Sequence, residues 1–299
     1  MAGVITLIKR SSLCSLYCQR SLRLALCLGL CLSLVACGGI FFYPNERWVQ
    51  NPARQGLDYQ DIILIHEDGL RLHGWWLPAE QQPFKGTVYF LHGNAQNVST
   101  HLMNVAWLPA RGYQVFILDY RGYGLSEGRA RLPGVAEDVQ LGLDWLKASG
   151  RVGDEAPLIV FGQSLGASLV ARVMGDERNQ GAADCVILEA GFAGYRDITR
   201  DVLRQSWLLS PLRFLITPTL PRQHDAINYI AGIAPTPLLI MHSEEDEIIP
   251  FEHGERLFEA AAEPKTFQRL RGRHIHSTTA EDVRDRLVEF MREDCRQGG

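Results

Sequence analysis

The sequence predicts one α/β domain built on a mostly parallel sheet. From residue 59 onward, short runs rich in Val, Ile, Leu and Phe alternate with segments of helical period, which is typical of a parallel sheet with helices on both faces. The chain has 299 residues and is 46% hydrophobic, so it can bury one sizeable core. It contains no internal repeat and no low-complexity tract.

The N-terminal residues have the layout of a signal sequence. Lys9, Arg10, Arg20 and Arg23 precede an apolar run from Leu24 to Ala36, and no Asp or Glu occurs among the first 45 residues. The run is 13 residues long, which suits the hydrophobic region of a signal peptide and is short of the roughly 20 residues of a membrane-spanning helix.

The end of this run resembles a bacterial lipobox. "LVAC" closes on Cys37, and the resemblance implies cleavage before this residue and lipid attachment to it. The alternatives are an uncleaved anchor or palmitoylation of other N-terminal cysteines, namely Cys14, Cys18, Cys27 and Cys31. Each alternative holds the chain at a membrane. Since no Asp follows Cys37, the resemblance implies the bacterial outer membrane, on its periplasmic side. We therefore divide the chain into a signal segment (1–37), a linker (about 38–57) and a domain (58–299).

The strands are expected where apolar runs end in Gly or polar residues. "YQDIILIHE" and "LRLHGWWLP" flank a "DG" pair and predict an antiparallel hairpin at a sheet edge. The later strands are expected at "GTVYFLHG", "YQVFILDYRG", "PLIVFGQS", "DCVILEAG", "PTPLLIMHSEED" and "KTFQRLRGRH".

Helical patterns fill the gaps between these strands, at Val98–Ala110, Gly134–Ala148, Leu165–Met174, Phe251–Ala262 and Thr279–Met291. One stretch, about 191–233, is too long for an ordinary loop and contains the apolar, proline-rich "SWLLSPLRFLITPTLP". It predicts a small lid over the carboxyl ends of the strands, or a helix and loop that only cover the sheet. As a lid, it would line an acyl pocket with Trp207, Leu208, Phe214 and Leu215.

Charge and cysteine content narrow the possible partners. The net charge of −4 and the pI near 6.1 offer no basic surface for nucleic acid. Five of the seven cysteines lie in residues 1–37, so the cysteines predict no disulfide framework. Cys185 lies in an apolar run and is expected to be a small buried hydrophobic residue.

The stretch "PLIVFGQSLGASLV" carries the clearest chemical signal. Its Gly-x-Ser-x-Gly pattern puts Ser164 where a strand pattern ends and a helix pattern begins. In such a turn the serine occupies a strained corner with its hydroxyl exposed, and Gly162 and Gly166 leave room for the adjacent strand and helix backbone. A serine hydroxyl also needs a base and an orienting carboxylate. Beyond the next apolar strands the chain supplies an acid in "HSEEDEIIP" and a histidine in "GRHIHS".

Five motifs in this order resemble the alpha/beta-hydrolase superfamily: "LHGN", "DYRGYGLSEG", "GQSLG", "D-x-x-x-P" and "G-x-H". The resemblance covers most of residues 59–292 and is closest to the membrane-tethered serine hydrolases called serine aminopeptidase-like. It implies an alpha/beta-hydrolase fold with a small lid. It also implies that Ser164 is the nucleophile, Asp246 the orienting acid and His274 the general base.

Other side chains compete for two of these roles. Glu244, Glu245 and Glu247 flank Asp246, but Asp246 matches the family's position four residues before a proline. His276 lies two residues beyond His274, and the "G-x-H" motif favours His274. The "HIH" pair is a poor metal site because no third ligand lies nearby in sequence.

The oxyanion of an acyl-transfer intermediate needs backbone N–H donors. Leu165, at the start of the following helix, is expected to give one, and Asn94 the second, with Ala95 as the near alternative. We expect His92 to brace this loop through hydrogen bonds. The "DYRGYGLSEG" cluster of Arg121, Tyr123 and Glu127 is expected to be scaffold.

Together these features predict a serine hydrolase that needs no cofactor and cleaves an ester or thioester of a small or lipid-like acyl substrate. The rival hypotheses are a serine peptidase and a non-catalytic envelope protein on the same fold.

Overall fold

The computed structural model describes residues 41–153, 156–205 and 207–295. Phe42–Gly299 forms one compact unit. The stretch expected as a linker therefore belongs to the domain from Phe42 onward, and its β1 (Tyr43–Pro44) pairs with β5 (Ala95–Gln96). The signal segment and its predicted lipid site, Cys37, lie outside the described residues. Within the described residues, no helix has both the length and the apolar character needed to cross a membrane.

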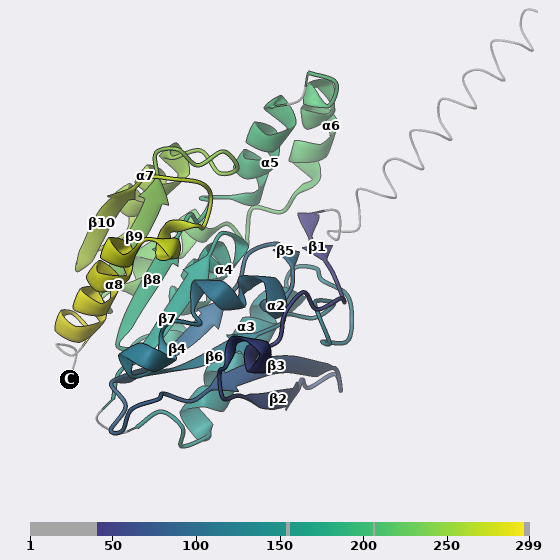
Figure 1. Cartoon of the computed structure of the whole chain (residues 1–299). Coiled ribbons are helices and arrows are strands. Elements are labelled where there is room, and N and C mark those ends of the chain that lie inside the picture. Colours follow the sequence, from purple (N-terminus) through teal and green to yellow (C-terminus); the bar gives the residue numbers. More distant parts are fainter. Residues whose placement is uncertain (1–40, 154–155, 206, 296–299) are drawn as a thin grey trace, which may run out of the picture. The chain divides into compact units, whose positions relative to one another are not determined.

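The sheet has eight strands in the order β10-β9-β8-β7-β4-β6-β3-β2 (Figure 1). Strands β2 (Gln60–Ile65) and β3 (Arg71–Leu77) form the expected antiparallel edge hairpin, and β3 also pairs antiparallel with β6. The remaining pairs are parallel, and their strands are β4 (Gly86–Leu91), β6 (Tyr113–Leu118), β7 (Leu158–Gln163), β8 (Cys185–Glu189), β9 (Leu238–Ser243) and β10 (Lys265–Leu270). The expected mostly parallel sheet is confirmed.

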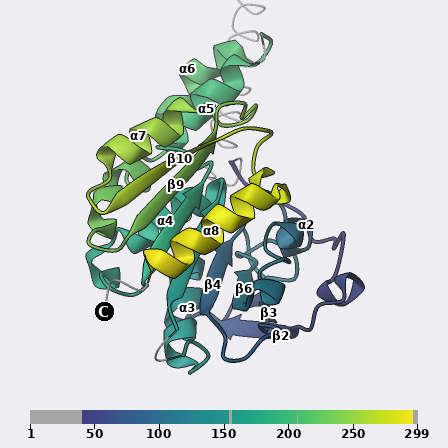
Figure 2. The ribbon, with the colours of Figure 1, turned by 60° about the vertical axis from the view of Figure 1, so that its left-hand side comes forward.

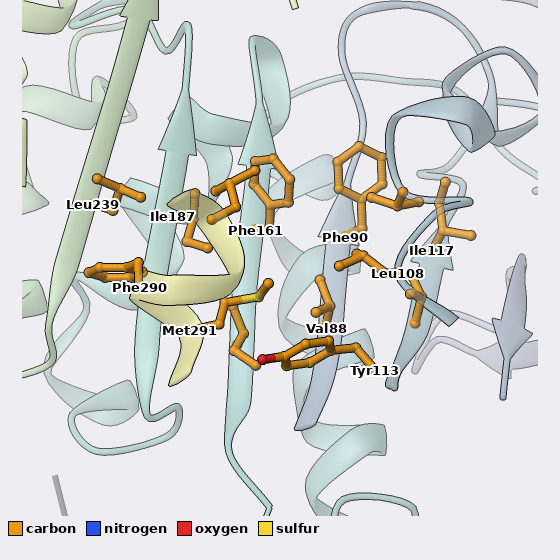
Figure 3. Close-up of a cluster of buried hydrophobic side chains, with 14 of the residues drawn as sticks. Val88, Phe90, Leu108, Tyr113, Ile117, Phe161, Ile187, Leu239, Phe290 and Met291 are labelled. Carbon is orange, nitrogen blue, oxygen red and sulfur yellow. The ribbon is translucent and has the colours of Figure 1, made fainter. Parts of the chain in front are cut away.

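One face of the sheet packs on α8 (Glu281–Glu293) and on the segment that begins with α2 (Val98–His101), as Figure 2 shows. The alternation of side chains in each strand sends one set to this face. Val88 and Phe90 of β4 join Ile187, Phe290 and other apolar side chains in a buried cluster (Figure 3).

The opposite face packs on α3 (Gly134–Ala148), α4 (Leu165–Met174) and α7 (Glu252–Ala260). Tyr89 of β4 points to this side, where its hydroxyl donates to the Val139 carbonyl at 3.1 Å. The bounds of α3 and α4 match the sequence prediction.

The prediction of one helix over Val98–Ala110 is wrong. Two 3₁₀ turns, Leu102–Asn104 and Pro109–Arg111, follow the short α2. The Trp107 indole donates to the Asn104 carbonyl at 2.8 Å, and Pro109 has no N–H to continue a helical ladder. Pro109 therefore keeps an α-helix from running through to Ala110, although α2 already ends at His101.

Residues 191–233 form α5 (Tyr195–Arg204), α6 (Arg213–Ile216) and short 3₁₀ turns. This stretch leaves the carboxyl end of β8, and α5 and α6 lie beyond that edge of the sheet (Figure 1). The four side chains expected to line an acyl pocket are instead exposed: Trp207 by 87%, Leu208 by 67%, Phe214 by 70% and Leu215 by 62%. Side chains this exposed do not line a pocket, so that part of the prediction is wrong.

The cysteine prediction is also wrong. Cys185, at the start of β8, and Cys295, just after α8, form a disulfide across a sequence separation of 110 residues. Helix α8 crosses the sheet and returns the chain to the amino end of β8. The spacing of Cys185 and Cys295 in the sequence does not indicate that the two residues are close in space.

We predict that Cys295→Ala lowers the free energy of unfolding by about 2–5 kcal/mol, because the disulfide closes a long loop in the unfolded chain. Thermal unfolding with and without dithiothreitol measures the effect. The reductant should lower the melting temperature of the wild type and leave that of the variant unchanged. Equal responses of the two proteins would contradict the prediction.

Candidate active site

Ser164 lies at the turn between β7 and α4. Its φ of 55° and ψ of −114° are unusual for a residue with a side chain, so the backbone is strained at this position. The turn is tied to the next strand, because the Ser164 N–H donates to the Glu189 carbonyl at 2.8 Å. The strained corner expected from the sequence is present, but the expected exposure is wrong, because only 7% of Ser164 is exposed.

The two glycines of the motif permit close backbone contacts. A Cβ added to Gly162 would lie 2.5 Å from the Gly166 carbonyl oxygen, and one added to Gly166 would lie 2.0 Å from the Leu91 oxygen of β4. Either contact is well inside van der Waals distance. Glycine at both positions therefore lets α4 pack against β7 and β4.

The three predicted catalytic residues meet at the carboxyl edge of the sheet. The Ser164 hydroxyl oxygen lies 3.0 Å from His274 Nε2, and His274 Nδ1 lies 2.7 Å from Asp246 Oδ2. Ser164 follows β7, Asp246 follows β9 and His274 follows β10. Both distances are within hydrogen-bond range for a nucleophile, a base and an orienting acid. The catalytic roles themselves stay a prediction.

Asp246 is held as a carboxylate. Its side chain is fully buried, and its Oδ1 accepts hydrogen bonds from the N–H groups of Ile248 and Ile249, both at 2.9 Å. Burial alone would raise the pKa of Asp246, but the hydrogen bond with His274 and the two amides outweigh it and lower the pKa. The acid is therefore ionised at neutral pH and orients the imidazole.

The neighbouring glutamates hold the histidine loop. Glu245 accepts from the Gly272 N–H at 2.9 Å, and Glu247 accepts from the His274 N–H at 3.1 Å. Hydrogen bonds from its own amide and that of His274, together with Arg273, lower the pKa of Glu247 to about 2. We expected these flanking acids to be solvated; they bind the backbone of the histidine loop instead. The only sequence signal for this supporting role was that the two glutamates stand next to Asp246 in the chain.

His276 is turned away from the serine. Its Nδ1 donates to the His274 carbonyl oxygen at 2.7 Å. Of the two rings in "HIH", the structure therefore brings His274 to Ser164. The part of the chain described here contains no group of three or more His, Cys, Asp or Glu arranged to hold a metal ion.

Both proposed oxyanion donors lie beside Ser164. Leu165 is the first residue of α4, so its N–H has no acceptor within the helix. The loop after β4 passes close to the nucleophile, since a Cβ on Gly93 would lie 3.5 Å from Ser164 Cβ. The peptide that follows carries the Asn94 N–H, and Ala95 is one residue further on. Their role as donors stays a prediction.

Two aromatic side chains support this loop. The Tyr123 hydroxyl lies 2.9 Å from both the carbonyl and the side-chain oxygen of Asn94. His101 Nε2 donates to the Ala95 carbonyl at 3.0 Å, and its ring stacks on that of His92. His92 is fully buried and its Nδ1 donates to the Gly93 carbonyl at 2.7 Å. The bracing role expected of His92 agrees with these contacts, whereas His101 was missed.

The scaffold role expected for "DYRGYGLSEG" also agrees with the contacts. Arg121 pairs with the buried Asp138 of α3 at 2.7 Å, and Glu127 accepts from the Arg71 N–H at 3.0 Å. Tyr123, by contrast, reaches the loop of the candidate site.

A buried polar network beneath the triad was not foreseen. Glu189, at the end of β8, accepts from the Gln163 amide at 2.6 Å and from the Ser277 hydroxyl. Gln163 precedes the nucleophile and Ser277 follows the base by three residues. Burial raises the pKa of the Glu189 carboxyl. The network links the serine turn to the histidine loop.

The sheet has eight strands, one of them reversed, and a serine lies at a strained strand–helix turn. An acid and a histidine follow later strands. These features together define an alpha/beta-hydrolase architecture. A family model described as "Serine aminopeptidase, S33" matches residues 82–227. The chain is 32% identical over 258 residues to the uncharacterized protein YfhR of Escherichia coli K12, covering 84% of this chain and 86% of that protein. It is 32% identical to the alpha/beta hydrolase domain-containing protein WAV2 of Arabidopsis thaliana, covering 73% of this chain and 71% of that protein. The chain belongs to the alpha/beta-hydrolase family.

Two more distant similarities are informative. The lysophosphatidylserine lipase ABHD12 of Danio rerio is 25% identical over 73% of this chain and 63% of its own length. The solved structure of the Pyrococcus furiosus esterase Pf2001 superposes with a TM-score of 0.66 at 21% identity, covering 84% of this chain and 96% of that one. The structural likeness confirms the predicted fold.

We predict that His101 limits stability in acid. Burial, aided by the nearby His92, lowers the pKa of His101 to about 3, whereas the unfolded chain protonates it near pH 6.5. The free energy of unfolding that the neutral, buried His101 contributes is therefore fully present above about pH 6.5 and is lost as the pH falls toward 3. At pH 4 the loss is about 3 kcal/mol. Urea unfolding at pH 7 and pH 4 should show a smaller acid loss for His101→Gln than for the wild type.

His66→Gln is the matched control, because His66 lies in the surface turn between β2 and β3. It should lose as much stability as the wild type. An acid loss for His101→Gln equal to that of the wild type would disprove the prediction.

Proposed function

We propose that this hydrolase cleaves a carboxylic ester or thioester through an acyl-enzyme on Ser164. The observation that carries the proposal is the continuous hydrogen-bonded chain from the Ser164 hydroxyl through His274 to the buried carboxylate of Asp246. This arrangement suits proton removal from the hydroxyl while its oxygen attacks a carbonyl carbon.

In the first step, Ser164 Oγ bonds to the substrate carbonyl carbon and His274 Nε2 takes the hydroxyl proton. The oxyanion accepts hydrogen bonds from the Leu165 and Asn94 N–H groups. When this tetrahedral intermediate collapses, the bond to the leaving alcohol or thiol breaks, and the leaving group receives the proton from His274. In the second step, His274 takes a proton from water while the water oxygen attacks the acyl carbon; the bond to Ser164 Oγ then breaks, Oγ receives the proton back from His274, and the acid is released. Asp246 stays ionised and stabilises the imidazolium in both steps.

We favour an ester or thioester over a peptide as the substrate, because the acids beside Asp246 are already paired with other groups of the protein. Cleavage next to a free amino terminus needs a carboxylate to bind the ammonium group. Glu245 and Glu247 already bind the histidine loop, and Glu244 pairs with Arg269 at 2.9 Å. The lipase and esterase names of two similar proteins support the same choice.

We also propose that the enzyme works in the cell envelope, lipid-anchored at Cys37 to a bacterial outer membrane on its periplasmic side. The cationic and apolar N-terminal sequence supports this. The Cys185–Cys295 disulfide supports it independently, because disulfides persist in oxidising compartments such as the periplasm. A lipid-like acyl substrate fits this setting.

A fluorophosphonate probe tests the nucleophile. It should label the wild type and fail to label Ser164→Ala, whose ester hydrolysis should fall by at least about 10³-fold. Ser149→Ala, at the carboxyl end of α3, is the control and should label normally. Equal labelling of Ser164→Ala would remove Ser164 from the mechanism.

A substrate panel tests the bond that is cleaved. p-Nitrophenyl esters of increasing chain length, assayed beside aminoacyl anilides, should give kcat/KM values at least about 10²-fold higher for the best ester, because the three glutamates beside Asp246 are already paired and do not serve the anilide's ammonium group. Higher values for the anilides would replace the esterase proposal with an aminopeptidase.

A further inference from the structure

The part of residues 191–233 that leads into α6 carries exposed apolar side chains. We call this group the apolar tip, and it consists of Trp207, Leu208, Leu209, Leu212, Phe214 and Leu215, which are between 40% and 87% exposed. Six large apolar side chains within nine positions exceed the scattered exposure normal for a soluble surface. Such a surface calls for a partner.

The stretch that carries the apolar tip is basic in sequence, and Arg204 at its start pairs with Asp201 of α5 at 3.5 Å. Residues 202–224 contain three arginines and no Asp or Glu. Arg204, just before the tip, has a side chain that is 60% exposed, and Arg213 lies over the Phe214 ring at 4.3 Å. Apolar side chains with arginines among them match the boundary between acyl chains and anionic headgroups.

The chain enters the domain at the same edge of the sheet. Strand β1 pairs with β5, which follows the carboxyl end of β4, and the Tyr43 N–H donates to the Asn94 side chain at 3.2 Å. Helix α5 follows the carboxyl end of β8, and Figure 1 shows β1, α5 and α6 all toward this edge. Five residue steps separate Cys37 from Phe42, so a lipid on Cys37 keeps Phe42 within about 18 Å of the attachment point.

The tip is also joined to the candidate site. Gln205 donates to the Glu247 carbonyl at 3.5 Å, directly beside Asp246. Ile248, two residues after Asp246, is 46% exposed. The segment that leads to the tip therefore contacts the loop that bears the acid, and this loop has an exposed apolar side chain of its own.

We infer that the apolar tip inserts into an anionic lipid bilayer and turns the candidate site toward the membrane surface. A second copy of the chain is a poorer occupant, because a tip-to-tip contact would bring the arginines of both copies together. The inference rests on the proposed membrane attachment and does not depend on catalysis. It specifies that an ester substrate enters from the lipid phase.

Tryptophan quenching by lipids tests the insertion. The full chain is reconstituted on phosphatidylglycerol-containing vesicles whose acyl chains are brominated, because bromine quenches indole fluorescence only at close range. Trp207 is the exposed indole among six tryptophans, and the other five are buried or half-buried. Quenching should be strong in the wild type and fall at least about threefold in Trp207→Phe.

Trp107→Phe is the matched control, since its half-buried ring lies near Arg284 of α8, and it should keep the wild-type quenching. The Ser164→Ala chain should also be quenched like the wild type, which separates this test from that of the proposed reaction. If the chain floats with the vesicles but the wild type and Trp207→Phe are quenched equally, tip insertion is overturned and the proposed lipid anchor is retained. Failure to float would overturn both, and loss of quenching with a concentration-dependent dimer would assign the tip to a second copy.

Discussion

The candidate site depends on one constraint, the convergence of parallel strands at their carboxyl ends. Strands β7, β8, β9 and β10 are consecutive neighbours, so Ser164 and His274 follow strands that are three spacings, or about 14 Å, apart. The imidazole closes this gap because the loop after β10 bends back across the sheet edge. The bend is held by Glu245 and Glu247, which bind its backbone, and by Ser277, which binds Glu189. The geometry of the base is thus set by acids on two intervening strands.

Much of this arrangement was predictable from sequence because it follows from local patterns. Each apolar run produced a strand, and the Gly-x-Ser-x-Gly turn needs only its own glycines and its neighbours. The order of Ser164, Asp246 and His274 along the chain then fixes which strand ends they follow. What could not be predicted depends on contacts between distant segments. Cys185 and Cys295 are brought together by the path of α8, and no pattern in either segment encodes that path.

The direction of the apolar side chains in residues 191–233 shows the same limit. Apolar composition predicts that a segment avoids water, but it does not state whether the protein interior or another phase receives it. In residues 207–215 the large apolar side chains are exposed, so the same sequence that suggested a pocket produced an exposed surface. Proline at 211 and 218 interrupts the helical pattern there, so no continuous helix folds the segment back over the sheet.

The loop after β4 connects the chemistry of the site with the attachment of the chain. Asn94 is the proposed oxyanion donor, and its side chain accepts from both Tyr43 of β1 and Tyr123. Strand β1 begins six residues after Cys37, the proposed anchor. Under the proposed anchoring, a pull at the membrane would act on β1 and through it on the Asn94 peptide. Since a donor displaced by a fraction of an ångström stabilises an oxyanion less, the two proposals together predict that the position of the chain on the bilayer affects the competence of the site.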